Sequence, residues 1–454
     1  MIQGAINPLD GRYFEKTRAL APYFSEQALM KYRVLMECEY LISLSFLNKT
    51  ALRRFKPAEV KILRNIYEKF NDSAYQKIKE FEKTTNHDVK AVEYYIKQIL
   101  EKTSLKDSIE WVHFALTSED TNNIAYALML ADSIEKIIAP EIGKIVLELN
   151  GLAKRYKNLP MLARTHGQSA SPTTFGKEMK VFSARIEKML TSLADLKIQA
   201  KLNGATGNYN AHVAAYPKVN WREFSVKFIN GFNKNRKQKL ETNLITTQIE
   251  CHDSYIAVFD NIRRINAVLL DFDQDMWRYI SDGWIIQKPK AGETGSSTMP
   301  HKVNPIDFEN SEGNLGLANA FFEFFARKLP VSRLQRDLSD STVERAFGTA
   351  FGHSYLAYIM LRKGLGKISI NDKAIKEYLV AHPEVIAEAI QTVLRREGAA
   401  MPYEALKELT RGKVVTMMDF DRFIDTLEVS PKVKKELKKF TPLNYIGLAS
   451  KLAS

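Results

Sequence analysis

The sequence is poor in the residues that interrupt helices and in those that cross-link chains. Its 454 residues include 21 glycines and 15 prolines, about 8% of the chain, against roughly 12% in average proteins. So few turn-forming residues favour long helices over many short strands. Cys38 and Cys251 are the only cysteines and lie far apart, which excludes a disulfide framework and a CxxC zinc site.

Long apolar runs and targeting segments are also missing. The uncharged run Ala346–Leu361 spans 16 residues, fewer than the roughly 20 that a membrane helix needs. The N-terminus carries Asp10 and Glu15 and has no apolar signal region, so we expect a cytoplasmic protein. There is no Walker loop and no GxGxxG after a strand, and we therefore predict neither a metal nor another cofactor.

The charge is strongly positive, with a formal net value of +13, and this raises the possibility of a nucleic-acid partner. Much of the excess is dispersed along the chain, and no RNP motif or basic tail accompanies it. The one local cluster is interrupted by Glu436 and is typical of a solvated helix face: Lys432, Lys434, Lys435, Lys438 and Lys439. An anionic small substrate explains basic residues equally well, so we predict no nucleic-acid and no membrane partner.

Three segments have apolar residues spaced by fours and threes, the period of helices packed at shallow angles. We expect helices of about 25 to 40 residues in a bundle, far above the mean of about 11. Pro140 should kink or restart the third. The segments are Phe175, Met179, Phe182, Ile186, Met189, Leu193, Leu196; Val258, Ile262, Ile265, Leu269, Phe272, Met276, Tyr279; and Ile124, Leu128, Ala131, Ile134, Ile138, Ile142, Ile145, Leu149.

The predicted fold class is therefore all-α, with three helical domains at residues 1–110, 111–365 and 366–454, the second being the helix bundle. Stretches rich in Gly, Ser, Thr and Asn separate the long helices, and we interpret them as loops. They are residues 165–174, 203–210 and 291–304. Small polar loops beside rigid helices are where chemistry is usually placed.

The most specific of these loops reads GSSTMPHKVNP, residues 295–305. Gly295 allows a sharp turn that exposes backbone amides, while Lys302 and Asn304 add a cation and an amide. Together they predict a site for a carboxylate.

This loop resembles the signature of the fumarase/aspartase superfamily, and the chain is most similar to the long bacterial form of the adenylosuccinate lyases. The resemblance runs from end to end. It includes DGRY at 10–13, TTNHDVKA at 84–91, FALTSED at 114–120, RTHGQ at 164–168, GNYNAH at 207–212, TQIE at 247–250 and RDLSDST at 336–342. Ser169, Ser171 and Cys251 depart from the usual pattern, which puts loop rigidity in question rather than activity.

The resemblance implies an all-helical homotetramer whose central bundle is shared by four subunits. It implies β-elimination of fumarate from adenylosuccinate, giving AMP, and from the succinylated aminoimidazole carboxamide ribotide (SAICAR), giving AICAR, in purine nucleotide biosynthesis. Such an elimination requires a base for a carbon-bound proton, stabilisation of the resulting dianion and an acid for the leaving nitrogen. It requires no cofactor.

Catalytic roles follow from the same resemblance. His166 is the predicted general acid, and Glu309 occupies the place of the glutamate that pairs with this histidine in the family. Ser296 is the predicted base, which is unusual for a hydroxyl and requires loop amides and a cation such as Lys302 after water is excluded. His87 is the second histidine, which contacts phosphate or orients the acid.

A further set of residues resembles the family's substrate contacts. The resemblance implies that one group holds the nucleotide, largely through its phosphate, whose oxygens suit arginine side chains: Arg12, Tyr13, Arg336, Ser341 and Arg345. It implies that Thr117, Ser118 and Gln248 contact the succinyl or purine parts. The set comprises Arg12, Tyr13, Asn86, His87, Asp88, Thr117, Ser118, Gln248, Asn304, Arg336, Ser341 and Arg345.

The positions of His166 and Ser296 suggest that sites are shared between subunits. His166 precedes one long helix and Ser296 follows another, so we expect the two loops at opposite ends of a bundle, where a 30-residue helix spans about 45 Å. His166 would then meet Ser296 of a neighbouring chain. Three alternatives stay open: a different lyase of the superfamily, a helical nucleic-acid-binding protein, and an inactive structural relative.

Overall fold

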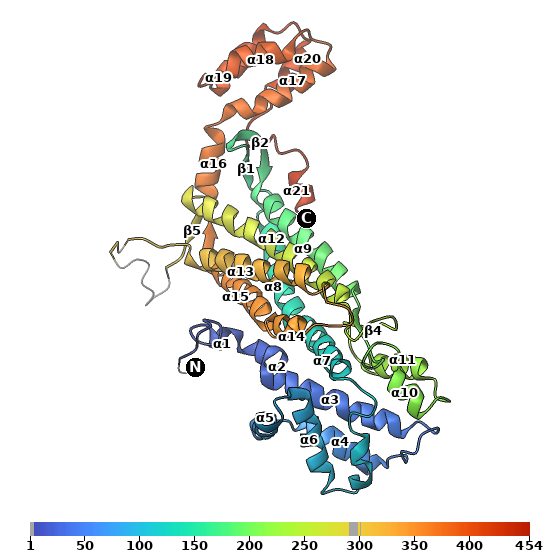
Figure 1. Ribbon diagram of the computed structural model, residues 1–454. Helices are drawn as coiled ribbons and strands as arrows, with labels where there is room; N and C mark the ends of the chain where they lie inside the picture. Colours follow the sequence, from blue (N-terminus) through green and yellow to red (C-terminus); the bar gives the residue numbers. More distant parts are fainter. Residues whose placement is uncertain (1–3, 290–297, 300) are drawn as a thin grey trace. The chain divides into compact units, whose positions relative to one another are not determined.

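The structure of the protein is a computed structural model that describes residues 4–289, 298–299 and 301–454 (Figure 1). Helices make up most of it. The strands described are short and form three two-stranded sheets. The predicted all-α class is confirmed, and the scarcity of glycine and proline is its simplest cause.

The chain divides into two compact units. Unit 1 comprises Met1–Ile142, Lys188–Ala267 and Gly313–Ile359, and unit 2 comprises Gly143–Glu187, Val268–Glu312 and Met360–Ser454. The chain passes between the units several times, so each unit is assembled from distant segments. The expected division into segments 1–110, 111–365 and 366–454 stays a prediction.

Unit 1 begins with helices whose ends are set by capping side chains. Ser25 accepts a hydrogen bond from the amide of Ala28 at the start of α3, and Asn71 does the same for Ala74 in α5. Helix α3 packs against α7 (Ser118–Ser133), and α5 packs against α6. The elements are α1 (Phe14–Thr17), η1 (Arg18–Leu20), α2 (Ala21–Phe24), α3 (Glu26–Ser45), α4 (Pro57–Glu68), α5 (Asp72–Thr85), α6 (Asp88–Leu100) and η2 (Lys106–Trp111).

The third patterned segment is a nearly continuous helical run with an irregularity just before Pro140. Helix α7 (Ser118–Ser133) leads into a π-helical turn (η3, Ile134–Ile138), and α8 (Ala139–Arg155) follows. Pro140 is the second residue of α8, where its missing amide hydrogen costs least, and the wider turn accommodates its ring. The helical run therefore continues through Pro140 without a restart, and the irregularity that accompanies this proline is the π-helical turn before it.

The rest of unit 1 supplies the segments around its polar centre. Strands β3 (Ile198–Ala200) and β4 (Leu240–Thr242) pair in parallel. Three short helices complete the list: α10 (Asn210–Ala215), α11 (Trp221–Gly231) and α14 (Ser339–Glu344). The stretch at 203–210 lies outside regular structure until α10 begins, as predicted.

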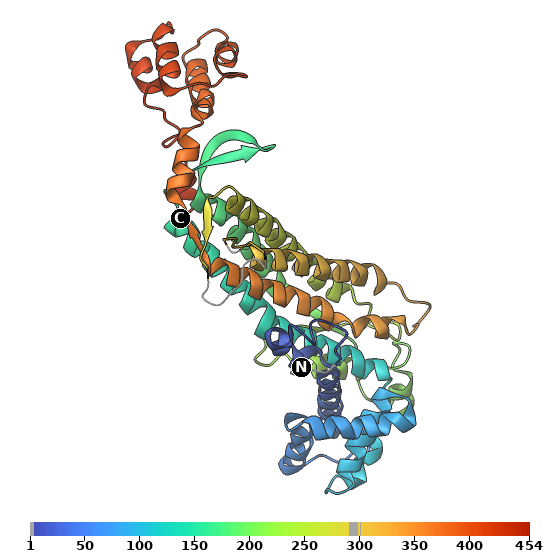
Figure 2. The ribbon, with the colours of Figure 1, turned by 90° about the vertical axis from the view of Figure 1, so that its left-hand side faces the viewer.

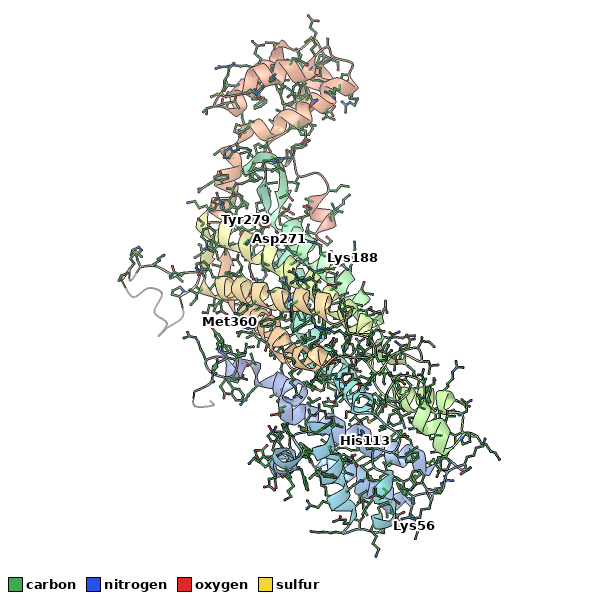
Figure 3. The ribbon with its side chains drawn as sticks, viewed as in Figure 1. Lys56, His113, Lys188, Asp271, Tyr279 and Met360 are labelled. Carbon is green, nitrogen blue, oxygen red and sulfur yellow. The ribbon has the colours of Figure 1, made fainter. Side chains whose placement is uncertain are left out.

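Four longer helices contribute to both units. They are α9 (Phe175–Asp195), α12 (Asp253–Ser281), α13 (Ile306–Lys328) and α15 (Phe347–Leu365). At 29 residues α12 has the expected length, whereas α9 ends after 21. In unit 2, two aromatic pairs join α9 to α12: Phe175 to Tyr279 at 6.3 Å and Phe182 to Phe272 at 5.2 Å between ring centroids. All four residues belong to the predicted apolar pattern. Tyr279 is labelled in Figure 3.

The predicted loop at 165–174 is wrong in large part. Residues Gln168–Thr174 form strand β2, which pairs antiparallel with β1 (Pro160–Thr165). A two-stranded ribbon exposes much of its surface, so its polar side chains resembled those of a loop. The stretch at 291–304 lies mostly outside the described residues.

Unit 2 also contains the C-terminal segment, where β5 (Ile285–Gln287) pairs antiparallel with β6 (Ile368–Ile370). Helix α16 packs against β1, and Figure 2 shows the β1–β2 hairpin beside it. The elements are α16 (Asp372–Val380), η4 (Pro383–Ile386), α17 (Ala387–Arg396), α18 (Pro402–Thr410), α19 (Met417–Thr426), α20 (Pro431–Leu437) and α21 (Ala449–Leu452).

The lysine cluster at 432–439 is a solvated helix face, as expected, since Lys432, Lys435, Lys438 and Lys439 are exposed. Glu436 in α20 pairs with Arg396. No described helix is long and apolar enough to cross a membrane.

Candidate functional site

Arg336 lies at the centre of a buried charge cluster in unit 1. Its Nη2 atom is 3.2 Å from Oε2 of Glu119, and its Nε atom is 3.3 Å from Oδ2 of Asp340. Its Nη1 atom donates a long hydrogen bond of 3.5 Å to Oε1 of Gln248. Glu119 and Asp340 are buried, and Arg336 is only 12% exposed. We call these four residues the Arg336 cluster.

A second group of buried charges adjoins the cluster. Nε2 of His252 lies 3.2 Å from Oε1 of Glu344, and the backbone amide of His252 donates to Oε2 of Glu250 over 2.8 Å. Burial alone would lower the pKa of His252, but the hydrogen bond and charge of Glu344 outweigh it and raise this pKa. His252 and Glu344 therefore form a buried ion pair.

Glu119 carries its proton more tightly than an ordinary glutamate. Burial raises the pKa of Glu119 to about 8, the negative charges of Glu344 and Asp340 add to this, and Arg336 offsets part of it. The short contact with Arg336 alone would suggest an ionised pair. Burial outweighs this contact, because the buried carboxylates Glu119, Glu250, Asp340 and Glu344 outnumber the cations Arg336 and His252. At neutral pH we assign Glu119 as largely protonated.

Arg345 and Arg33 share the carboxylate of Asp88. Each guanidinium places a nitrogen 2.8 Å from Oδ2 of Asp88. Burial would raise the pKa of Asp88, but the positive charges and hydrogen bonds of both arginines hold it well below its usual range. Arg33 is buried whereas the Arg345 side chain is 45% exposed, so Arg345 can still bind an anion.

His87 lies at the corner between α5 and α6, next to Asp88. Asn86 ends α5 in the left-handed conformation, with φ of 49°, and His87 caps α6 through its Nδ1 atom, which accepts a hydrogen bond of 3.2 Å from the amide of Lys90. In the neutral ring the proton is then on Nε2. The His87 side chain is half exposed, so Nε2 can donate to a ligand.

The remaining predicted contacts of unit 1 lie on helix starts and at the N-terminus. Thr117 forms a capping box with Asp120 before α7, and Ser118 is the first residue of that helix. Ser341 donates its backbone amide to Asp340, 2.6 Å away. The Arg12 guanidinium lies 5.8 Å from the ring centroid of Tyr13.

Two cavities of unit 1 are bounded by Arg345. One, of about 420 Å³, lies against the N-terminal segment and includes Asp10, Glu26 and Gly348 in its lining. The other, of about 270 Å³, includes Tyr126 and Glu344 as well. Arg345 is the predicted site residue that both share.

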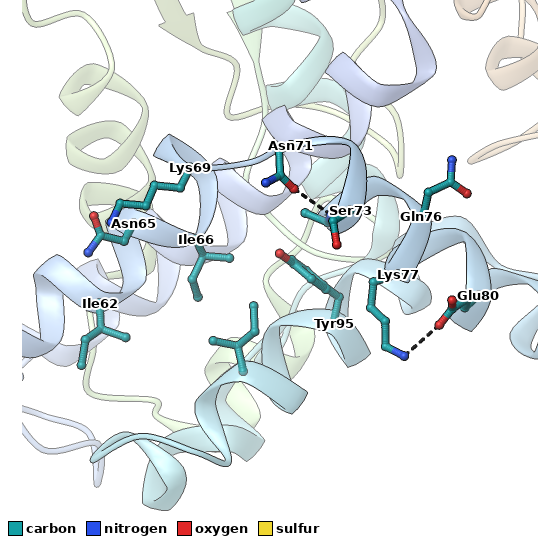
Figure 4. A pocket seen from close by; sticks show the side chains of 12 residues that line it. Ile62, Asn65, Ile66, Lys69, Asn71, Ser73, Gln76, Lys77, Glu80 and Tyr95 are labelled. Atoms are coloured by element: carbon teal, nitrogen blue, oxygen red, sulfur yellow. Dashed lines mark hydrogen bonds and ion pairs between the residues drawn. The ribbon is translucent and has the colours of Figure 1, made fainter.

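A further cavity of about 680 Å³ lies between α4, α5 and α6 (Figure 4). It is lined by isoleucines, Tyr95 and a polar rim in which Lys77 pairs with Glu80. None of the predicted site residues lines it. We therefore do not assign it to the site.

In unit 2, His166 lies in a two-residue hairpin turn. Thr165 pairs with Gln168, and both His166 (φ 55°) and Gly167 (φ 74°) have positive φ, which defines a type I′ turn. Such a turn projects from the ribbon, and His166 is exposed.

The other predicted residues of unit 2 lie near the start of α13. The amide of Lys302 donates to the carbonyl of Met299, and Asn304 precedes the helix. Glu309 accepts a hydrogen bond of 3.2 Å from Nε1 of Trp277. Within the described part of the chain, no ion pair joins Glu309 to His166, so their pairing stays a prediction. Ser296 lies outside the described residues.

The helix-length reason for expecting the two loops at opposite ends of the bundle is wrong, although Ser296 itself lies outside the described residues. Helices α9 and α12 run antiparallel in unit 2, as the contact between Phe175 at the start of α9 and Tyr279 near the end of α12 shows. The chain before α9, which carries His166, and the chain after α12 therefore leave the helices at the same end. Helix length no longer argues for a site shared between subunits.

Several residues of the charge clusters were not predicted: Arg33, Glu119, Glu250, His252, Asp340 and Glu344. Most lie in or beside motifs that carry the family resemblance, such as FALTSED and TQIE, so a signal was present. Their burial is not readable from the sequence. Among the described residues, no group of three or more His, Cys, Asp or Glu side chains could hold a metal ion.

Comparison with solved structures defines the class of fold. The structure of a fumarate lyase from Mesorhizobium sp. BNC1 matches with a TM-score of 0.72 at 15% identity, covering 97% of this chain and 96% of that chain. A 3-carboxy-cis,cis-muconate lactonizing enzyme from Pseudomonas putida matches with a TM-score of 0.74 at 18% identity, covering 98% and 97%. The chain has the helical fold that these two enzymes share.

Sequence comparison then gives the family. Residues 11–319 match the family model described as lyase, and residues 332–446 match adenylosuccinate lyase C-terminal. The adenylosuccinate lyase of Legionella pneumophila (strain Corby) is 51% identical over 451 residues, 99% of this chain and 97% of the relative. Those of Dictyostelium discoideum and Escherichia coli K12 are 49% and 46% identical, each over 98% of this chain and 96% and 97% of the relative. The chain belongs to the adenylosuccinate lyase family, which confirms the resemblance and the assignment as a lyase.

Proposed function

We propose that the enzyme eliminates fumarate from adenylosuccinate to give AMP, and from SAICAR to give AICAR. The observation that carries this proposal is the 51% identity to a named adenylosuccinate lyase over 99% of the chain. The two family models, which together span residues 11–446 with a short gap, support it.

The charges of unit 1 support binding of such a polyanionic substrate. Arg345 is half exposed beside two cavities, and Asp88 and Arg33 restrict its orientation. A guanidinium that is already oriented binds phosphate oxygens with little further ordering. We assign Arg345, with Arg12 and Tyr13, to the nucleotide phosphate.

The remaining polar groups of unit 1 suit the rest of the substrate. Arg336 and Gln248 are held together, and Thr117, Ser118 and Ser341 lie at helix starts. We assign Arg336 and Ser341 to the nucleotide, largely through its phosphate. We assign Gln248, Thr117 and Ser118 to the succinyl and purine parts. His87, flanked by Asn86 and Asp88, contacts phosphate or orients the acid.

The proposed reaction balances as a β-elimination. Ser296, as an alkoxide stabilised by Lys302 and loop amides, removes the proton from the carbon beside one carboxylate, while Asn304 helps to bind that carboxylate. The electron pair forms the carbon–carbon double bond of fumarate, and the carbon–nitrogen bond breaks. His166 donates a proton to the leaving nitrogen, and Glu309 keeps the imidazole ready for this step.

We further propose a cytoplasmic homotetramer with active sites shared between subunits. The family resemblance supports this arrangement, and the exposure of His166 is compatible with it, since an exposed catalytic side chain can be covered by another chain.

The proposal is tested by product analysis. Purified protein is incubated with adenylosuccinate and, separately, with SAICAR, and fumarate and nucleotide are quantified. We expect equal amounts of fumarate and AMP, or of fumarate and AICAR, and release that is at least about 10²-fold slower in a His166→Gln variant. Fumarate release from a different succinyl compound alone would assign the chain to another lyase. Salt-sensitive nucleic-acid binding without fumarate release would support the nucleic-acid alternative.

A further inference from the structure

Arg164 lies two residues before His166 on strand β1, and its side chain is enclosed by residues of distant segments of unit 2. Its guanidinium carbon is 4.4 Å from the ring centroid of Trp284 and 5.1 Å from that of Tyr378. Its Nη1 atom is 2.5 Å from Oδ2 of Asp282. Arg164 is 18% exposed and Asp282 15%, so this ion pair is shielded from water.

The partners of Arg164 belong to a rigid framework. The Trp284 ring is 1% exposed, stacks on Tyr279 of α12 at 5.7 Å, and meets Tyr378 of α16 edge-on at 5.3 Å. The backbone carbonyl of Trp284 accepts a hydrogen bond from the amide of Asn371. The end of α12, the start of β5 and helix α16 thus converge on one guanidinium.

The hairpin that carries His166 depends on such external contacts for its orientation. An isolated two-stranded ribbon is only marginally stable in water, and its turn residues make few contacts of their own. Arg164 is two residues from the turn, about 7 Å along the strand. A contact so close to the turn limits how far His166 can move.

We propose that Arg164 is a positioning residue for the elimination reaction, holding the His166 hairpin against Asp282, Trp284 and Tyr378. This inference rests on the proposed function, because it assumes that His166 donates the proton. Arg164 does not touch the substrate. It acts by keeping the imidazole where the leaving nitrogen will be, and a displacement of about 1 Å can cost about 10²-fold in rate.

The chemistry of the contact requires arginine in particular. A planar guanidinium can stack on aromatic rings while its edge donates to a carboxylate, which a lysine ammonium cannot do in the same geometry. Arg164→Lys therefore keeps the charge and removes the stacking. Arg185→Lys is the matched control, since Arg185 of α9 pairs with Asp271 over 3.0 Å in an exposed ion pair of the same unit.

The test measures kcat and KM for adenylosuccinate in the full-length enzyme. Arg164→Lys should lower kcat by about 10- to 100-fold while KM changes by less than about threefold, and Arg185→Lys should change neither. The double variant Arg164→Lys/His166→Gln should be no slower than His166→Gln alone, because a misplaced acid matters only if the acid is present. Multiplicative losses, or an unchanged kcat in Arg164→Lys, would overturn the inference.

Hydrogen exchange separates this inference from the proposed function. Amides of residues 163–170 should exchange at least about tenfold faster in Arg164→Lys than in the wild type or in Arg185→Lys. Equal exchange in all three proteins would overturn the proposed positioning role of Arg164, even if the enzyme is active. A wild type that releases no fumarate would instead overturn the proposed function, while faster exchange in Arg164→Lys would still support the contact.

Discussion

The Arg336 cluster of unit 1 and the His166 hairpin of unit 2 are built in opposite ways. Arg336 is only 12% exposed, contacts buried carboxylates from α7 and α14, and donates a long hydrogen bond to Gln248, so its position is determined within one chain. His166 is exposed at a two-residue turn and has no ion-pair partner among the described residues. The proposed binding group Arg336 is held by residues of its own chain, whereas the proposed acid His166 is exposed at the turn.

The two regions therefore differ in what they contribute to the free energy of folding. A buried charge cluster is expensive to desolvate, and its members must satisfy one another before any ligand arrives. An exposed histidine has little effect on the free energy of folding. Its reactivity depends on the groups that surround it when the substrate is bound. Substitutions in the two regions should therefore affect different quantities.

The largest effect is expected for His166→Gln. The glutamine side chain is uncharged and cannot serve as a general acid, so kcat should fall by at least about 10²-fold. Thermal stability should stay close to that of the wild type, because His166 is exposed. Steady-state kinetics and a melting curve check both points. Near-normal turnover would remove His166 from the mechanism.

A smaller effect, on binding rather than on chemistry, is expected for Arg345→Ala. Asp88 retains Arg33, so the fold should tolerate the loss, but the substrate phosphate loses a charge-assisted contact. KM should rise by about tenfold or more, with a lesser change in kcat. A collapsed kcat at unchanged KM would contradict the assignment of Arg345 to phosphate.

The last comparison concerns stability rather than turnover and uses Glu119→Gln. The folded-state pKa of Glu119 is raised to about 8, from an ordinary value of 4.5. The proton on Glu119 therefore contributes stability below about pH 4.5, and this contribution is lost as the pH rises through 8. Glutamine imitates the protonated form and has no such pH dependence.

Unfolding of wild type and Glu119→Gln should be compared between pH 5 and 9. The free energy of unfolding of the variant should rise relative to that of the wild type as the pH increases through this window. The difference should be on the order of a few kcal/mol at the alkaline end. Asp271→Asn, at an exposed ion pair, is the control and should show no such trend. A constant difference between Glu119→Gln and wild type would mean that Glu119 is ionised throughout.

The contrast between the regions also explains what could be predicted from the sequence. The spacing of Phe175, Phe182, Phe272 and Tyr279 correctly predicts two long helices. The apolar residues of packed helices recur at a fixed period, and this period is visible in the sequence. The π-helical turn just before Pro140 is likewise linked to a single residue, whose amide hydrogen is missing. Both are local properties.

Other features depend on contacts that no local pattern encodes. The small polar residues at 168–174 predict a loop, but they form strand β2 because they pair with β1. The direction of α9 relative to α12 determines which loops meet, and spacing alone did not reveal it. The partners of Arg336 come from three separate segments, so the raised pKa of Glu119 is a consequence of tertiary burial.

The most direct test of the central claim, that catalytic residues of different chains complete each site, uses two inactive variants. His166→Ala and Ser296→Ala proteins are mixed in equal amounts, gently unfolded and reassembled, and fumarate release from adenylosuccinate is measured. If His166 and Ser296 of one site come from different chains, about one quarter of the sites should be whole after random mixing. We predict activity near a quarter of the wild type. Mixed tetramers as inactive as either parent would contradict the claim and place both residues in one chain.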